Sequence, residues 1–161
     1  MRLKKKRMLK KKWLEKIERA RKVEQEILLW FQKTHDPKAT LSQGYNAECD
    51  IISSKGCVEI KEDRLAHQTG NYALEFITHD DKPSGFMGST SDYFVIVDWE
   101  YVLVMSTQWL RDYINEMEVK KTIEMGETFN DGKRNKGYLI PRDKLLNNEM
   151  VQVLERWFSN E

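Results

Sequence analysis

Apolar residues spaced three or four positions apart run through the first quarter of the chain. They recur from Leu9 to Phe31, which is the spacing of one face of a long α-helix. Pro37 disfavours helical backbone at the residue before it, so we expect the helix to end within 34–40. The start of the chain therefore predicts one long helix.

Shorter apolar segments separated by turn residues follow, and they favour β-strands. We expect strands at 45–52, 57–61 and 72–78, and a pair of apolar strands at 93–97 and 101–105. Residues 80–92 form a loop with a short helical turn, and the Asp131–Gly132 dipeptide predicts a hairpin or a mobile loop. Helical spacing returns at 107–118 and at 148–158.

This element order predicts an α/β (α+β) domain with three layers. The chain of 161 residues is 40% hydrophobic and contains five Trp, six Tyr and six Phe, which is enough for one compact core. We expect a basic helical arm at 1–22 running into a single domain over 13–161.

Composition also bears on location. No run of eighteen apolar residues is present, and the charged N-terminus lacks the apolar segment of a secretory signal. We therefore expect no membrane partner and a cytoplasmic location. The two cysteines, Cys49 and Cys57, give neither a metal-binding spacing nor a disulfide framework, which favours a reducing compartment.

The net charge of +1 conceals a strong asymmetry. Residues 1–22 carry twelve Lys/Arg and two Glu, or +10, whereas the other 139 residues carry fifteen Lys/Arg and twenty-four Asp/Glu, or −9. Such a segment is typical of an arm that binds a polyanion, although a solvated helix end or a localisation signal has the same composition. The nucleic-acid-binding candidates are Lys4, Lys5, Lys6, Arg7, Lys10, Lys11 and Lys12.

Two carboxylates stand in the apolar hairpin at 47–63. If 51–52 and 57–58 pair across the Ser-Ser-Lys-Gly turn, Asp50 lies directly opposite Glu59, and Lys61 shares the face of Glu59. Opposed like charges destabilise a sheet unless they share a proton, reach water or bind a cation such as Mg²⁺. The alternative is an ordinary hairpin whose charged face is exposed.

Glu24 falls near the middle of the apolar face that the long helix forms between Ile17 and Phe31. A buried glutamate is costly unless it is paired or bound to a metal. We therefore expect Glu24 to meet the Asp50, Glu59 and Lys61 cluster, unless it extends from the edge of the face to water.

Asp50, followed after eight residues by Glu59-Ile60-Lys61, resembles the signature of the PD-(D/E)xK nucleases, with Cys49 in place of the proline. The common core of that superfamily, a helix, three strands, a helix and a strand, is similar to residues 9–105. The segments 59–76 and 82–97 resemble small phage and bacterial nucleases in which the lysine is followed by Thr-Gly-Asn and by a strand with a glutamate.

The resemblance implies a restriction-endonuclease-like fold, a mixed central sheet flanked by helices. It also implies Mg²⁺- or Mn²⁺-dependent hydrolysis of DNA, with RNA not excluded, in a bacterial or phage-infected cell. Its implied catalytic residues are Glu24, Asp50, Glu59 and Lys61, and its implied metal ligands are Asp50, Glu59 and the carbonyl of Ile60. Gln68, Thr69 and Asn71 are auxiliary candidates, or an ordinary turn around Gly70. For Glu75, an exposed strand position is the favoured interpretation.

Other functions fit parts of the pattern. One is a non-catalytic nucleic-acid-binding protein, and another is an interaction module anchored by Trp99, Trp109 and Trp157. His35, His67 and His79 lack a zinc spacing and are expected on surfaces or loops, with His67 near enough to the motif for an auxiliary role. A paired cut across two strands would require a homodimer.

Overall fold

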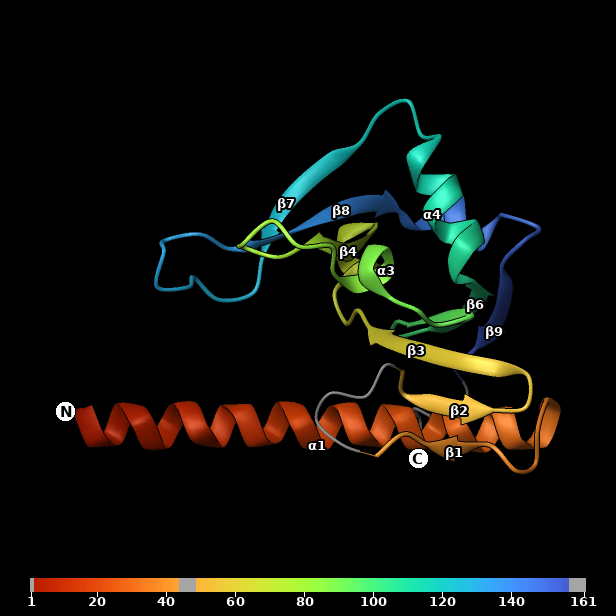
Figure 1. Cartoon of the computed structure of the whole chain (residues 1–161), viewed down its shortest axis with the longest axis horizontal. Helices are drawn as coiled ribbons and strands as arrows, with labels where there is room; N and C mark the ends of the chain where they lie inside the picture. The colour runs from red at the N-terminus through yellow and green to blue at the C-terminus, as the bar shows by residue number, and fades with distance from the viewer. Residues whose placement is uncertain (1, 44–48, 157–161) are drawn as a thin grey trace.

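The computed structural model describes residues 2–43 and 49–156. Its elements in chain order are α1 (Arg2–Thr34), β1 (Thr40–Leu41), β2 (Ile51–Ser53), β3 (Gly56–Glu62), α2 (Ala66–Thr69), β4 (Asn71–Ile77), α3 (Gly85–Gly88), β5 (Tyr93–Val97), β6 (Tyr101–Ser106), α4 (Thr107–Asn115), β7 (Lys121–Met125), β8 (Asn135–Pro141), α5 (Arg142–Leu146) and β9 (Gln152–Glu155). The chain is therefore a mixed α/β protein, as its sequence predicts (Figure 1).

Two sheets organise these elements. The central sheet is mixed, with strand order β1-β2-β3-β5-β6-β9: β3 and β5 run parallel, and the pairs β1–β2, β2–β3, β5–β6 and β6–β9 run antiparallel. The second sheet, β4-β8-β7, is antiparallel. The strand expected at 72–78 does form as β4, but it pairs with β8 and not with the central sheet.

The central sheet is buried on both faces, which gives three layers. Val23, Ile27 and Phe31 of α1 pack on one face against alternate residues of β2, β3, β5 and β6. The other alternate residues, such as Phe94 and Ile96, pack against β4, β8, α3, α4 and α5. A strand buried on both faces is apolar throughout, and this explains the continuous apolar runs of β5 and β6.

The N-terminal half of α1 extends beyond the rest of the molecule (Figure 1). Residues 4–16 are all exposed, whereas Val23 and Ile27 are buried. The predicted helical arm is therefore present. No helix in the described ranges combines the length and apolarity needed to cross a lipid bilayer.

Two predicted elements differ from the structure. Instead of a helix over 148–158, β9 pairs antiparallel with β6, because the edge of β6 offers unpaired backbone groups and Val153 and Leu154 fit a strand as well as a helix. The strand expected over 45–52 is limited to Ile51–Ser53 in the described residues, since Cys49 and Asp50 leave the ladder and 44–48 lie outside them.

Candidate functional site

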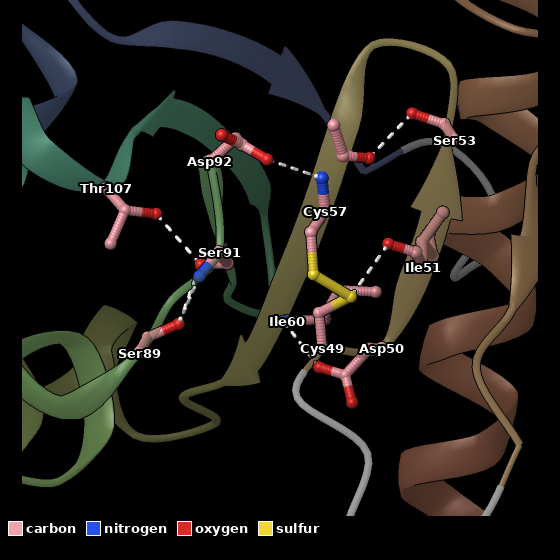
Figure 2. Close-up of a disulfide and its surroundings, with 11 residues drawn as sticks. Cys49, Asp50, Ile51, Ser53, Cys57, Ile60, Ser89, Ser91, Asp92 and Thr107 are labelled. Atoms are coloured by element: carbon pink, nitrogen blue, oxygen red, sulfur yellow. Dashed lines mark hydrogen bonds between the residues drawn. A yellow bond between two sulfur atoms is a disulfide. The ribbon is translucent and has the colours of Figure 1, made fainter.

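The β2–β3 hairpin has the predicted register. Ile51 pairs with Val58 and Ile52 with Cys57, so the turn is centred on Ser54–Lys55 as expected. The ladder ends at Ile51, and Asp50 does not become a strand residue opposite Glu59. Instead, its Oδ2 accepts a hydrogen bond of 2.7 Å from the backbone N–H of Ile60 (Figure 2). The Asp50 carboxylate thus lies against the edge of β3, beside the motif.

A disulfide bond between Cys49 and Cys57 holds this arrangement (Figure 2). The expectation of no disulfide was therefore wrong. The hairpin folds the chain back so that the two Cα atoms, eight residues apart in sequence, lie 5.9 Å apart, within the range that a disulfide spans. Because disulfides persist mainly in oxidising compartments, this bond gives no support to the reducing location that the cysteine count favoured.

Glu59 and Lys61 share one face of β3, as the alternation of a strand requires. Lys61 Nζ lies 2.8 Å from Glu59 Oε1, and about half of the Lys61 side chain is exposed (50%). Burial opposes the charged form of Lys61, but Glu59 and then Asp50 and Glu75 outweigh it and raise the pKa of the amine. Lys61 therefore remains an ammonium group within a set of carboxylates.

Glu24 reaches the same cluster from α1. The buried neighbours Val23 and Ile27 fix the helix against the sheet, which leaves Glu24 half-buried. Desolvation and then the negative charge of Asp50 raise the pKa of Glu24, with Glu59 adding to the shift. The charges of all three motif side chains therefore act on this carboxyl group, which lies on the face of α1 that packs against the sheet.

Glu75 belongs to the site, although an exposed strand position was the favoured interpretation. It lines a small pocket of about 200 Å³ together with Lys61, and its Oε2 accepts a hydrogen bond of 3.3 Å from Asn135 of β8. Gly85, at a positive φ of 54°, packs directly on the Glu75 carbonyl where a side chain would clash. The lack of a side chain at Gly85 therefore lets α3 approach β4 behind Glu75.

The cluster carries more negative than positive charge. Desolvation raises the pKa of Asp50, the Ile60 N–H opposes this shift, and Glu59 adds to it. Carboxylate oxygens are the ligands that Mg²⁺ prefers, and the Ile60 carbonyl points to the same edge of β3 as its N–H. The donors thus suit a hard divalent ion in type and charge.

The side chains are not prearranged as a metal cage. Within 2–43 and 49–156, no group of three or more His, Cys, Asp or Glu side chains has a geometry that would hold an ion. The Glu59–Lys61 ion pair accounts for part of this, since it engages a carboxylate that would be a ligand. A metal that used Oε1 of Glu59 as its ligand would have to displace Lys61 from that oxygen.

The auxiliary candidates have different surroundings. Thr69 and Asn71 hydrogen-bond to each other around Gly70, which has a φ of 73°, and this matches the ordinary-turn interpretation. Gln68 lines a larger pocket of about 720 Å³ together with His67 and Trp99. The sequence left this pocket unrecognised, because its residues come from four separate segments, 62–68, Ala73, Trp99 and Met125.

The remaining candidates lie away from the cluster. His35 stacks on Phe31, and His79 lies 3.0 Å from Asp131 in the exposed loops. Trp109 stacks on Tyr113 and packs on the core, which does not favour an anchor role, while Trp157 lies outside the described residues. The basic candidates of α1, Lys4, Lys5, Lys6, Arg7, Lys10, Lys11 and Lys12, are all exposed.

No family model matches this chain, and neither the curated proteins nor the solved structures provide a significant match.

Proposed function

We propose that the protein is a metal-dependent endonuclease that hydrolyses phosphodiester bonds in nucleic acid, with Asp50, Glu59 and Lys61 at its centre. One observation carries the proposal: Asp50 accepts the Ile60 N–H beside the Glu59–Lys61 ion pair, and the charges of these three side chains act on the half-buried Glu24 of a distant helix. An ordinary hairpin with a charged exposed face gives no reason for a half-buried glutamate of α1 to meet the same carboxylates.

A restriction-endonuclease-like core is part of this proposal. In its support, α1 covers one face of a mixed sheet in which β3, the strand with the motif, runs parallel to β5. From α1 to β5 the chain forms a helix, three strands, the four-residue helix α2, strand β4, the four-residue helix α3 and strand β5, where the expected core has a helix, three strands, one helix and a strand. The departure is β4, which belongs to the second sheet.

Asp50, Glu59 and the Ile60 carbonyl would hold Mg²⁺ or Mn²⁺ in this proposal, with Glu24 and Glu75 as neighbouring carboxylates. When bound, such an ion supplies Lewis acidity and lowers the pKa of a water molecule. Asp50 is oriented for the task, since its N–H donates to Val58 O at 2.8 Å and its Oδ2 accepts from Ile60.

Lys61 holds positive charge beside the phosphate, where it stabilises the charge that develops in the transition state and orients the attacking water. Its raised pKa keeps it protonated at neutral pH. A half-exposed ion pair contributes only about 0–1 kcal/mol, so Lys61 can leave Glu59 at little cost when substrate arrives.

The proposed substrate is DNA, with RNA as an outcome to be tested, in the cytoplasm of a bacterial or phage-infected cell. The exposed basic residues of α1 support a polyanion partner, because lysines that neutralise phosphates release counterions and gain affinity without sequence preference. Cleavage of both strands at one locus would further require a homodimer.

The deciding experiment is a cleavage panel of duplex, single-stranded and branched DNA and of RNA, with Mg²⁺, Mn²⁺ or EDTA. Asp50→Asn and Lys61→Ala are expected to lower the cleavage rate by about 10²–10⁴-fold. Lys55→Ala is the matched control, since Lys55 is an exposed lysine at the turn of the same hairpin. Full-rate cleavage by Asp50→Asn, or cleavage that persists in EDTA, would refute the proposal.

A non-catalytic nucleic-acid-binding protein is the second candidate. The observation in its favour is the Glu59–Lys61 ion pair, which engages the central carboxylate of the motif. This candidate predicts binding that does not depend on metal and that proceeds without cleavage of any substrate in the same panel.

A further inference from the structure

A pocket of about 720 Å³ opens at the carboxyl ends of the parallel strands β3 and β5. Its walls come from the segment after β3, from α2 and from Trp99, which follows β5. Pockets of 300–1,000 Å³ commonly hold small-molecule groups, and the carboxyl ends of parallel strands are frequent ligand sites. The position and size are those of a binding site.

This pocket adjoins the candidate catalytic cluster. Glu62, Ala73 and Met125 line both this pocket and the smaller pocket that contains Lys61 and Glu75. A polymer with one phosphate beside Lys61 would therefore extend a neighbouring unit into the larger pocket.

An aromatic surface forms part of the pocket wall. The ring of Trp99 stacks on that of His67, with centroids 6.1 Å apart and planes inclined by 25°. Trp99 nevertheless remains 51% exposed, and neither hydrophobic cluster of the described residues includes it. A tryptophan that is not needed for the core and keeps a free aromatic surface suits the stacking of another planar ring.

Both acidic residues that line the pocket, Glu62 and Asp63, already have partners within the protein. Glu62 Oε1 lies 2.5 Å from Arg19 Nε, and both carboxylate oxygens of Asp63 accept backbone N–H groups, from Leu65 and Ala66 at Oδ1 and from Ala73 at Oδ2. Arg64 keeps 55% of its side chain exposed and lies 3.9 Å from Glu62. Arg64 is therefore an exposed cation at the rim of the pocket, beside carboxylates that already have partners.

Polar groups without partners complete the pocket. Within the described residues, the Gln68 side chain makes no hydrogen bond, and His67 Nδ1 is buried with no hydrogen-bond partner. The exposed Gln68 amide, the Trp99 ring and the Arg64 guanidinium match, in that order, the edge, the face and the phosphate of a nucleotide.

We propose that this pocket binds an unpaired nucleobase of the substrate strand, stacked on Trp99, with Arg64 at its phosphate. The inference rests on the proposed nuclease function and deepens it, because it makes the substrate a nucleic acid with a single-stranded or unpaired segment next to the scissile phosphate. A base held in a duplex stack does not enter such a pocket without being extruded.

The test is equilibrium binding of the full chain to fluorescent single-stranded DNA and RNA oligonucleotides in EDTA, where no cleavage occurs. An abasic site is placed at each position in turn. For the wild-type protein, removal of the base at one position is expected to weaken binding by about 5–150-fold, the range for one base stacked on an aromatic ring. Comparison of the DNA and RNA series shows which of the two nucleic acids the pocket binds more tightly.

Trp99→Ala should bind the intact oligonucleotide with the affinity that the wild type shows for the oligonucleotide lacking the base at the critical position. Removal of that base should not weaken the binding of Trp99→Ala further. Trp99→Phe should keep the base dependence. Trp13→Ala is the control, since Trp13 has a similar exposure of 50% but lies on α1 outside the pocket, and its variant should retain the base dependence.

Two outcomes overturn the inference: no abasic position changes the affinity of the wild type, or Trp99→Ala keeps the full base dependence. Either result leaves the proposed hydrolysis to its own test, cleavage that requires Asp50 and metal. Conversely, base-dependent binding through Trp99 without cleavage of any substrate would support the pocket and overturn the hydrolysis.

Discussion

Reduction of the Cys49–Cys57 disulfide should destabilise the protein and disturb the Asp50 carboxylate together. The bond closes a short loop, with a sequence separation of eight residues. In the chain-entropy model, a cross-link over this length stabilises the folded state by about 2.5 kcal/mol at 25 °C. For a chain of this size, that free energy corresponds to a fall in Tm of about 5–10 °C.

The effect should extend to catalysis, because Asp50 directly follows Cys49 and lies outside the β-ladder. Its position depends on the disulfide, on its N–H bond to Val58 and on its carboxylate bond to Ile60. Loss of the first restraint lets the carboxylate move, and misplacement by about 1 Å can cost 10²-fold in rate. We therefore expect slower metal-dependent cleavage after reduction.

The assay measures urea unfolding and the cleavage rate for the oxidised protein and for the protein reduced with a phosphine. Thiol counts establish the redox state of each sample. The chain has two cysteines, so zero and two thiols distinguish the states. The double variant Cys49→Ala/Cys57→Ala is the control, since the phosphine should not change its behaviour. Equal unfolding free energies for the oxidised and reduced wild type would contradict the reasoning.

Three further predictions concern charge. Asp50→Asn should have a higher free energy of urea unfolding than the wild type at pH 7, and equal values there would refute this. Desolvation raises the folded-state pKa of Asp50, so the stability of the wild type falls as pH rises from the unfolded pKa through the folded pKa. The difference between the two proteins should vanish below about pH 3.9, where the carboxyl group is protonated in both states. Asp98→Asn should lower the free energy of urea unfolding by about 3–5 kcal/mol. Asp98 is fully buried and accepts hydrogen bonds from Tyr72 at 2.5 Å and from Arg142 at 3.0 Å. Asp112 is exposed, so the control variant Asp112→Asn should have little effect. Deletion of residues 1–12 should reduce the salt dependence of DNA binding. If all seven basic candidates contact phosphates, the magnitude of the slope of log K against log salt concentration should fall by up to about 6. An unchanged slope would show that these residues do not contact phosphates.

The sequence determined the local parts of this protein. The spacing of Ile17, Val23, Ile27 and Phe31 requires a helix with one apolar face, and the pairing across the Ser54–Lys55 turn follows from an even-numbered turn. The motif residues Glu59 and Lys61 fall on one face of β3 because side chains alternate along a strand. Each of these results depends on contacts between residues close in sequence.

Only the tertiary structure decided how distant segments meet. The apolar residues of 150–154 suit a helix or a strand, and the unpaired edge of β6 selects the strand β9. Pairing of β4 with β8 takes Glu75 to Lys61. The disulfide requires Asp50 to leave the ladder, since the regular register would place Cys49 opposite Ile60 and not beside Cys57.

The pocket at Trp99 has the same origin. Arg64 and His67, which follow β3, meet Trp99, which follows β5, because β3 and β5 end side by side. Local patterning encodes which side chains face each way along an element, but the partner of an edge or a face is chosen by the free energy of the whole packed chain. For this reason, the sequence predicted the four residues of the cluster, whereas the structure added Glu75, the disulfide and the neighbouring pocket.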